Sequence, residues 1–97
     1  MAIGVTAKLK VQPGKNAEFE AVFKTLSDAV HAQEPGCTLY ALHKSRTDEQ
    51  LYIVLEQYAD EAALGAHAKT EHYISAGKAL AACLAAAPEI ELMDSVG

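Results

Sequence analysis

The hydrophobic period of this 97-residue chain changes at Pro13-Gly14, and that change limits the folds it can adopt. From Gly4 to Val11 apolar and polar residues alternate, which is typical of a half-buried strand. Beyond the turn, apolar residues follow the spacing of one helical stripe: Phe19, Val22, Phe23, Leu26 and Val30. A strand followed directly by an amphipathic helix predicts a domain of mixed α and β structure.

Polar and proline residues set the expected limits of this helix. Asn16 can cap its N-terminus, because a short polar side chain accepts hydrogen bonds from the first free amides. Pro35 disfavours helical geometry at Glu34, so the helix should end near Gln33. Gly36 then allows the turn into the next element.

The rest of the chain predicts a hairpin, two helices and a final strand. Cys37–Lys44 and Leu51–Tyr58 are rich in β-branched, aromatic and aliphatic residues, as hairpin strands are. Asp60 and Thr70 are expected to cap two helices, and Glu89–Val96 alternates well enough for a fourth strand. This order is the split βαβ of ferredoxin-like domains, an α+β fold with helices on one face of an antiparallel sheet.

The other face of this sheet is expected to need a cover. The residues assigned to it combine apolar bodies with polar tips: Thr6, Lys8, Tyr52, Val54, Glu56 and Tyr58. A short chain buries only a modest fraction of its surface alone, and such a face suits burial against a second copy of itself. The sequence therefore predicts a homodimer of a single domain spanning residues 1–97.

Charge and composition disfavour several classes of partner. The 13 acidic and 8 basic residues give a net charge of −5, and no segment gathers Lys and Arg into the stripe that nucleic acids require. No apolar run reaches membrane-spanning length, and no secretory leader is visible. Because Cys37 and Cys83 form no CxxC pair, we expect reduced thiols in a cytoplasmic protein.

Five short motifs occur in the order and spacing of a known family. They are Gln12-Pro13-Gly14-Lys15, Glu34-Pro35-Gly36-Cys37, Glu56-Gln57-Tyr58, Ala63-Leu64-Gly65-Ala66-His67 and Thr70-Glu71-His72. Over essentially its whole length the chain resembles the antibiotic-biosynthesis monooxygenases, particularly the small quinol-monooxygenase branch. Each motif is weak alone, but five in register are fairly specific for fold and much less so for reaction.

The resemblance implies a dimeric α+β barrel, in which two ferredoxin-like protomers pack sheet to sheet and each holds a small pocket between sheet and helices. Related enzymes oxidise phenols, anthrones or quinols with O2 and use no flavin, haem or metal, so no cofactor is expected here. Tyr58 stands where the family often has tryptophan, which loosens any inference about substrate shape. Haem degradation is disfavoured, because Ala7, His67 and Gly77 occupy that branch's asparagine, tryptophan and axial-histidine positions.

Two histidines are the candidate catalytic residues. A neutral imidazole can remove a substrate proton near neutral pH, and His67 and His72 flank the junction of the two later helices. His67 is the favoured base. The alternative is that His67 ties the helix junction together through a hydrogen bond while His72 is solvated. Metal binding is disfavoured, since the five-residue spacing does not suit one helical face and no third ligand is evident.

Three further residues are predicted to contact substrate. Tyr73 and Tyr58 offer hydroxyl groups, and Glu56 lies within an otherwise apolar strand. A carboxylate buried there must be paired or have a raised pKa. The structural alternative makes Glu56 an interface partner of Lys8 or Arg46.

Two classes of function are consistent with these residues and with the resemblance. The first is a cofactor-independent monooxygenase that oxidises a small aromatic quinol or phenol with O2. The second is a non-catalytic module that binds a small hydrophobic molecule, for instance in a stress response, on the same dimeric barrel. An isomerase or a decarboxylase of a phenolic acid also fits a base in an apolar cavity.

Overall fold

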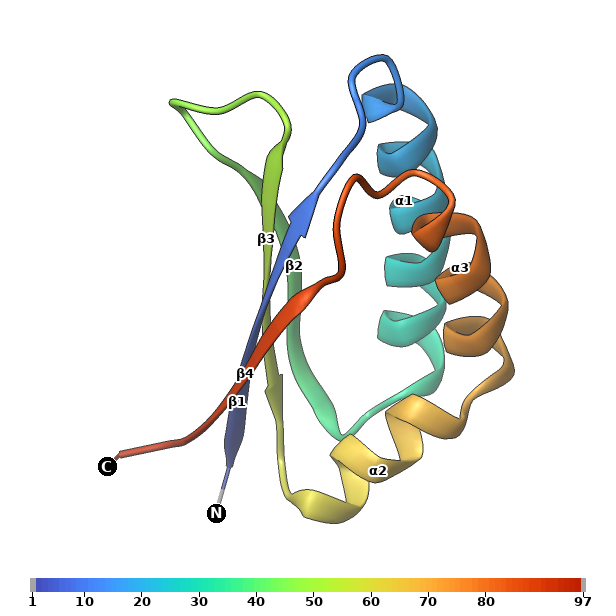
Figure 1. The fold of residues 1–97 in the computed structure, drawn as a ribbon. Helices are drawn as coiled ribbons and strands as arrows, with labels where there is room; N and C mark the ends of the chain where they lie inside the picture. The colour runs from blue at the N-terminus through green and yellow to red at the C-terminus, as the bar shows by residue number, and fades with distance from the viewer. Residues whose placement is uncertain (1, 97) are drawn as a thin grey trace.

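The computed structural model describes residues 2–96, and its elements follow the predicted order (Figure 1). They are β1 (Ile3–Lys10), α1 (Asn16–Gln33), β2 (Cys37–Lys44), β3 (Leu51–Tyr58), α2 (Glu61–Lys69), α3 (Glu71–Ala81) and β4 (Glu89–Asp94). The strands form one antiparallel sheet in the order β2-β3-β1-β4, and the helices lie on one side of it. The predicted α+β ferredoxin-like fold is confirmed.

The ends of the helices follow local sequence signals in most places. The side chain of Asp60 accepts a hydrogen bond from the amide of Ala63, and that of Thr70 accepts one from the amide of Tyr73. Both are the predicted N-caps. Helix α1 ends at Gln33, as expected from the proline that follows two residues later.

The predicted cap at Asn16 is wrong. Asn16 is the first residue of α1, and its side chain makes no capping hydrogen bond. Its amide nitrogen instead donates to the carbonyl of Glu49 and to the hydroxyl of Tyr52, at 2.8 and 3.0 Å. Asn16 therefore ties the start of the helix to the β2–β3 hairpin, a long-range role that the local pattern could not indicate.

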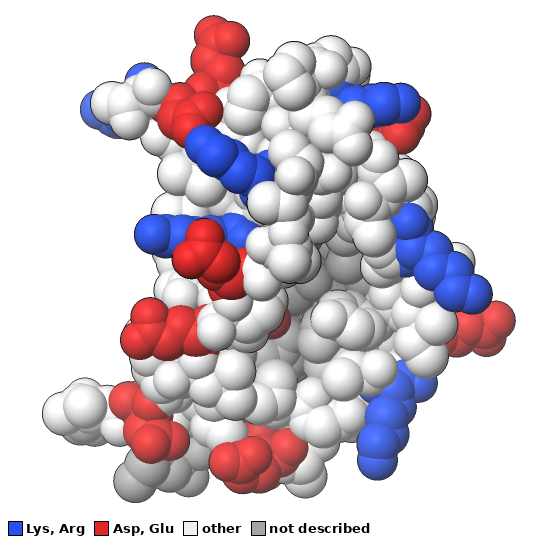
Figure 2. Space-filling model, in the orientation of Figure 1, with Lys and Arg blue, Asp and Glu red and all other residues white. Residues whose placement is uncertain are grey.

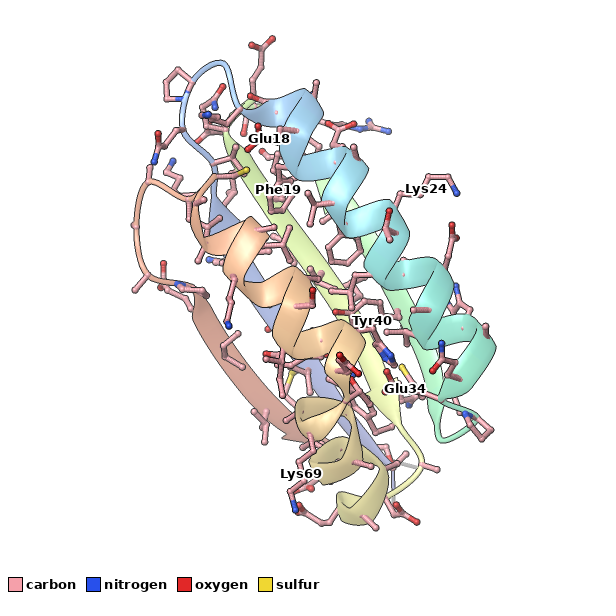
Figure 3. The ribbon with its side chains drawn as sticks, turned by 90° about the vertical axis from the view of Figure 1, so that its right-hand side faces the viewer. Glu18, Phe19, Lys24, Glu34, Tyr40 and Lys69 are labelled. Carbon is pink, nitrogen blue, oxygen red and sulfur yellow. The ribbon has the colours of Figure 1, made fainter. Side chains whose placement is uncertain are left out.

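The core lies between α1 and the sheet. The predicted apolar stripe of α1 faces the sheet: Phe19, Phe23, Leu26 and Val30 are buried, and Val22, at the edge of the stripe, is partly exposed. The ring centroids of Phe19 and Tyr52 are 4.7 Å apart, and those of Phe23 and Tyr40 are 5.4 Å apart and nearly parallel. Figure 3 shows Phe19 and Tyr40 in the layer between α1 and the sheet.

Strand β3 presents the opposite face from the one predicted. Four residues assigned to the outer face point towards the helices: Tyr52, Val54, Glu56 and Tyr58. Directly opposed residues of an antiparallel pair share a face, and Tyr52 pairs with Leu9 while Val54 pairs with Ala7. Because Ala7 and Leu9 are buried under the helices, their partners are buried there too.

The outer sheet face, defined as the face turned away from the helices, carries a different apolar set. Leu39, Leu55 and Met93 lie on it and are 43%, 37% and 40% exposed. Thr6 and Lys8 also lie there, as predicted. This observed outer face is more apolar than the face predicted from the sequence, and it therefore has a greater need for a partner.

Within residues 2–96, no helix has the length and apolar character needed to cross a membrane. Figure 2 shows acidic and basic side chains interspersed on the visible face, without a continuous basic stripe.

Candidate active site

A cavity of about 210 Å³ lies between the inner face of the sheet and α3. Its apolar wall includes Ala7, Leu9, Phe23, Leu26, Val54 and Leu80, and Ile90 of β4 lies at its edge. Figure 2 shows this side of the molecule hollowed between the sheet and the helices. An apolar cavity with few polar groups is the usual form of a site for a small organic ligand.

Main-chain hydrogen bonds anchor the segment that carries Leu84, a residue of the cavity wall. Leu84, which lines it, forms an isolated antiparallel bridge with Val11 just beyond β1. The amide of Gln12 donates to the carbonyl of Cys83, and the amide of Ala85 donates to the carbonyl of Lys10, both at 2.8 Å. This backbone clasp, comprising residues 10–12 and 83–85, anchors the segment between α3 and β4.

One carboxylate reaches the cavity. Glu56 of β3 lines it, and burial raises the pKa of Glu56 above its usual range. The hydroxyl of Tyr58 donates to Glu56 Oε1 at 2.6 Å, and this hydrogen bond partly opposes the rise in the pKa of Glu56. Glu56 faces inwards while Lys8 lies on the outer sheet face, so the two do not share the face that the sequence assigned to both.

Two phenol groups accompany this carboxylate. Tyr40 and Tyr73 line the cavity, and their hydroxyls have no hydrogen-bond partner among residues 2–96. Burial, and then the charge of Glu56, raise the pKa of Tyr40. Burial, and then the hydrogen bond that its hydroxyl donates to Glu56, raise the pKa of Tyr58. Tyr40 therefore stays protonated at neutral pH, and the hydroxyls of Tyr40 and Tyr73 can donate hydrogen bonds to a ligand.

The two predicted histidines meet on a carboxylate that sequence reasoning missed. His67 Nδ1 lies 2.8 Å from Glu34 Oε1, and His72 Nε2 lies 2.5 Å from Glu34 Oε2. The side chains of His67, His72 and Glu34 are 5%, 16% and 9% exposed. His72 is therefore not the solvated residue of the structural alternative, whereas the hydrogen bond expected of His67 is present.

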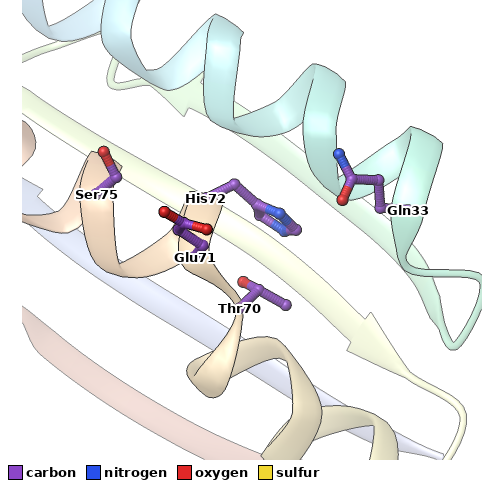
Figure 4. Close-up of a pocket in the computed structure, with 5 residues that line it drawn as sticks. All are labelled: Gln33, Thr70, Glu71, His72 and Ser75. Carbon is purple, nitrogen blue, oxygen red and sulfur yellow. The ribbon is translucent and has the colours of Figure 1, made fainter.

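Neither imidazole is among the groups that line the cavity. The ring of His67 lies behind the cavity, with centroid distances of 5.4, 5.3 and 4.6 Å to Tyr40, Tyr58 and Tyr73. His72 lines a shallow surface hollow together with Gln33, Thr70, Glu71 and Ser75 (Figure 4). The three linked side chains, His67, Glu34 and His72, thus run from the tyrosines of the cavity wall to the surface.

A tight turn places Glu34 between the two histidines. Figure 3 shows Glu34 at the C-terminal end of α1. A Cβ atom on Gly36 would lie 2.7 Å from the Cβ of Ala63, so only glycine lets the turn approach α2 this closely. The sequence signal that could have drawn attention to Glu34 is its place before this Pro-Gly turn, but nothing local indicates its partners.

Neither cysteine has the character of an activated nucleophile. Cys37 and Cys83 carry free thiols, and Cys83 is buried. Burial and the negative charge of Glu34 raise the pKa of Cys37 to about 11, so the thiol stays protonated at neutral pH. Among residues 2–96, no group of three or more His, Cys, Asp and Glu side chains is arranged to hold a metal ion.

Comparisons with solved structures agree with this fold. A crystal structure from Caulobacter crescentus, provisionally identified as an antibiotic biosynthesis monooxygenase, is 50% identical to this chain. It superimposes with a TM-score of 0.97 over 99% of this chain and 91% of the other. SnoaB of Streptomyces nogalater, a cofactor-independent oxygenase, shares the fold at 23% identity, with a TM-score of 0.84 over 97% of this chain and 92% of SnoaB.

Sequence comparisons identify the family. The Bacillus subtilis protein YcnE, whose name assigns it provisionally to the monooxygenases, is 33% identical over 81 residues, 80% of this chain and 84% of YcnE. Another curated relative is longer, and the match spans about half of it, 48%. Residues 2–79 match the family model for antibiotic biosynthesis monooxygenases. The chain therefore belongs to the antibiotic biosynthesis monooxygenase family.

Proposed function

We propose that this protein is a monooxygenase that oxidises a small aromatic quinol or phenol with O2, without a cofactor. The observation that carries the proposal is the apolar cavity into which one carboxylate and two free phenols project. Family membership and the oxygenase activity of SnoaB, which shares the fold, support it. A cavity of about 210 Å³ is smaller than the roughly 300–1,000 Å³ of sites for drug-sized ligands, which favours a small ring system.

The proposed reaction needs only a base and a dry cavity. A phenol that has lost its proton is electron-rich enough to pass an electron to O2. In a phenol, insertion of one oxygen atom at the ring C–H opposite the hydroxyl then gives a quinone. In a quinol the opposite carbon already carries a hydroxyl, so insertion at an adjacent ring C–H gives a hydroxyquinone. In both cases the second oxygen atom leaves as water with two hydrogen atoms of the substrate, so four electrons pass from substrate to O2. Exclusion of bulk water by the apolar wall strengthens the polar contacts inside.

Among the candidate bases, the geometry favours Glu56 as the group that accepts the phenolic proton. Glu56 lines the cavity, whereas His67 and His72, the bases proposed from sequence, do not. Either histidine would have to act through another group. Tyr73 is proposed to contact the ring or hydroxyl of the substrate, and Tyr58 to orient the carboxylate of Glu56.

Oxygen consumption tests the proposed activity. Metal-stripped protein should take up O2 above the autoxidation rate with one or more members of a panel of hydroquinones and naphthols, and heat denaturation should abolish this uptake. With the naphthols, the quinone product should appear by absorbance at one equivalent per O2 consumed. Tight binding of panel members without uptake would instead support the non-catalytic module.

We further propose that the protein is a homodimer joined through the outer sheet face. The exposed side chains of Leu39, Leu55 and Met93 support this assignment, because a stable interface needs an apolar centre. The free thiols of Cys37 and Cys83 support a cytoplasmic location, where thiols stay reduced.

Leu55→Asp is expected to dissociate this dimer while leaving the protomer folded, because it places a charge at the centre of the proposed interface. Sedimentation should give the mass of one 10.3 kDa chain for the variant and twice that for the wild type. Ala21→Asp, which adds the same charge on the exposed side of α1, is the control and should stay dimeric. A dimeric Leu55→Asp protein would exclude this face.

A further inference from the structure

We propose that Glu34 is a positioning residue for the cavity: by binding His67 and His72 together, it fixes the tautomer and orientation of His67 and, through them, the place of Tyr73. The inference rests on the proposed function only in taking the cavity as the ligand site. It assigns a task to three polar side chains, 5% to 16% exposed, that do not line the cavity themselves.

The chemistry of the shared carboxylate dictates the tautomers. An ionised carboxylate only accepts hydrogen bonds, so each imidazole must donate an N–H to Glu34. His67 therefore carries a hydrogen on Nδ1 and His72 carries one on Nε2. A carboxylate that is only 9% exposed needs such donors, because an unpaired buried charge is strongly unfavourable.

The same hydrogen bonds join α1 and α3, which line the cavity, to α2. Glu34 follows the last residue of α1, His67 lies in the last turn of α2, and His72 lies in the first turn of α3. Tyr73 is held from two sides, because it directly follows His72 in α3 and its ring packs 4.6 Å from that of His67. Displacement of either imidazole would move the tyrosine that lines the cavity.

The substitution Glu34→Gln distinguishes a positioning role from a packing role, because it changes the hydrogen bonds of the side chain but hardly its size. The glutamine oxygen can accept from only one of the two imidazoles, and the glutamine nitrogen donates to the other and therefore requires a lone pair on that ring nitrogen. One of the two histidines must then move its hydrogen to its other ring nitrogen. The matched control is Glu71→Gln, which removes an exposed carboxylate of the same first turn of α3 and leaves Glu34 intact.

Nuclear magnetic resonance of the ligand-free protein supplies the first test. Imidazole ¹⁵N shifts of the wild type should report hydrogen on Nδ1 of His67 and Nε2 of His72, and Glu34→Gln should reverse the assignment at one of the two histidines. The ring signals of Tyr73 should shift in Glu34→Gln and stay unchanged in Glu71→Gln. Wild-type His67 bearing its hydrogen only on Nε2, or unmoved Tyr73 signals in Glu34→Gln, would overturn the proposal.

Ligand affinity supplies the second test, with 1-naphthol as the probe. Glu34→Gln should weaken binding about tenfold and Glu34→Ala more, since small displacements of a binding group are costly, while Glu71→Gln should bind as the wild type does. A Glu34→Gln protein that melts at a lower temperature but binds 1-naphthol normally would show a merely structural role. If the wild type binds no phenol at all, the proposed function fails, and the ligand-free spectra still decide the role of Glu34.

Discussion

Glu56→Gln is expected to lower kcat/KM for an accepted quinol or naphthol by about 10²- to 10⁴-fold, the usual contribution of a positioned acid or base. The glutamine keeps the size of the side chain and an oxygen that can accept from Tyr58, but it cannot take up a proton. Initial rates of O2 uptake measure the effect. Glu49→Gln, an exposed carboxylate in the hairpin loop, is the control and should keep the wild-type rate.

The pH dependence of the same variant distinguishes a base from a structural group. Because burial raises the pKa of Glu56, the wild-type rate should rise with pH through a value above that of an ordinary carboxyl group. The uncatalysed rate must be subtracted, since the phenol itself ionises. Glu56→Gln should lack this rise. A variant with normal rates and a normal pH profile would show that Glu56 is not the base.

The raised pKa of Glu56 also determines how this residue makes the stability of the fold depend on pH. The folded protein holds the proton of Glu56 more tightly than the unfolded chain does, so this group's contribution is fully present at acid pH and is lost as pH rises through the raised pKa. The neutral glutamine avoids the loss. At neutral pH, Glu56→Gln should therefore melt at a higher temperature than the wild type while having lost its activity.

Val54→Asp is expected to destabilise the protomer by about 3–5 kcal/mol, as uncompensated buried charges do. Val54 is 2% exposed and packs between the sheet and the helices, beside the carboxylate of Glu56. Since small domains are stable by only about 5–15 kcal/mol, most of the margin would be lost. Urea unfolding followed by circular dichroism measures the change.

Comparison with Leu55→Asp makes this prediction specific to the strand face. The two residues are neighbours in β3, receive the same charge and point to opposite sides of the sheet. Val54→Asp should lower the free energy of unfolding, whereas Leu55→Asp should change the association state. If Val54→Asp were a well-folded monomer, its face assignment in the structure would be incorrect.

Local sequence patterns were sufficient to predict where the helices and strands lie, but not to predict which face of β3 is buried. Both hairpin strands match the prediction, because their apolar runs end sharply at a polar loop. In β3, however, Ile53 and Leu55 on one face are as apolar as Tyr52 and Val54 on the other. Only pairing with the buried residues of β1 decides which face lies inwards, and that pairing is not visible in the sequence of β3 itself.

The candidate site shows the same division between local and long-range information. His67 and His72 could be placed near each other because they flank one helix junction. Glu34 lies 33 positions before His67, and its contact with both histidines depends on the packing of α1 and of α2 against α3. The inward place of Glu56 was missed for the same reason as that of Val54.

The backbone clasp bears on how far the shape of the cavity can change without disturbing the fold. Its bonds run between amides and carbonyls of residues 10–12 and 83–85, so they depend little on which side chains these positions carry. Leu84 projects from this anchored segment into the cavity. Substitution of the Leu84 side chain can therefore change the shape of the cavity while the main-chain hydrogen bonds of this segment stay in place.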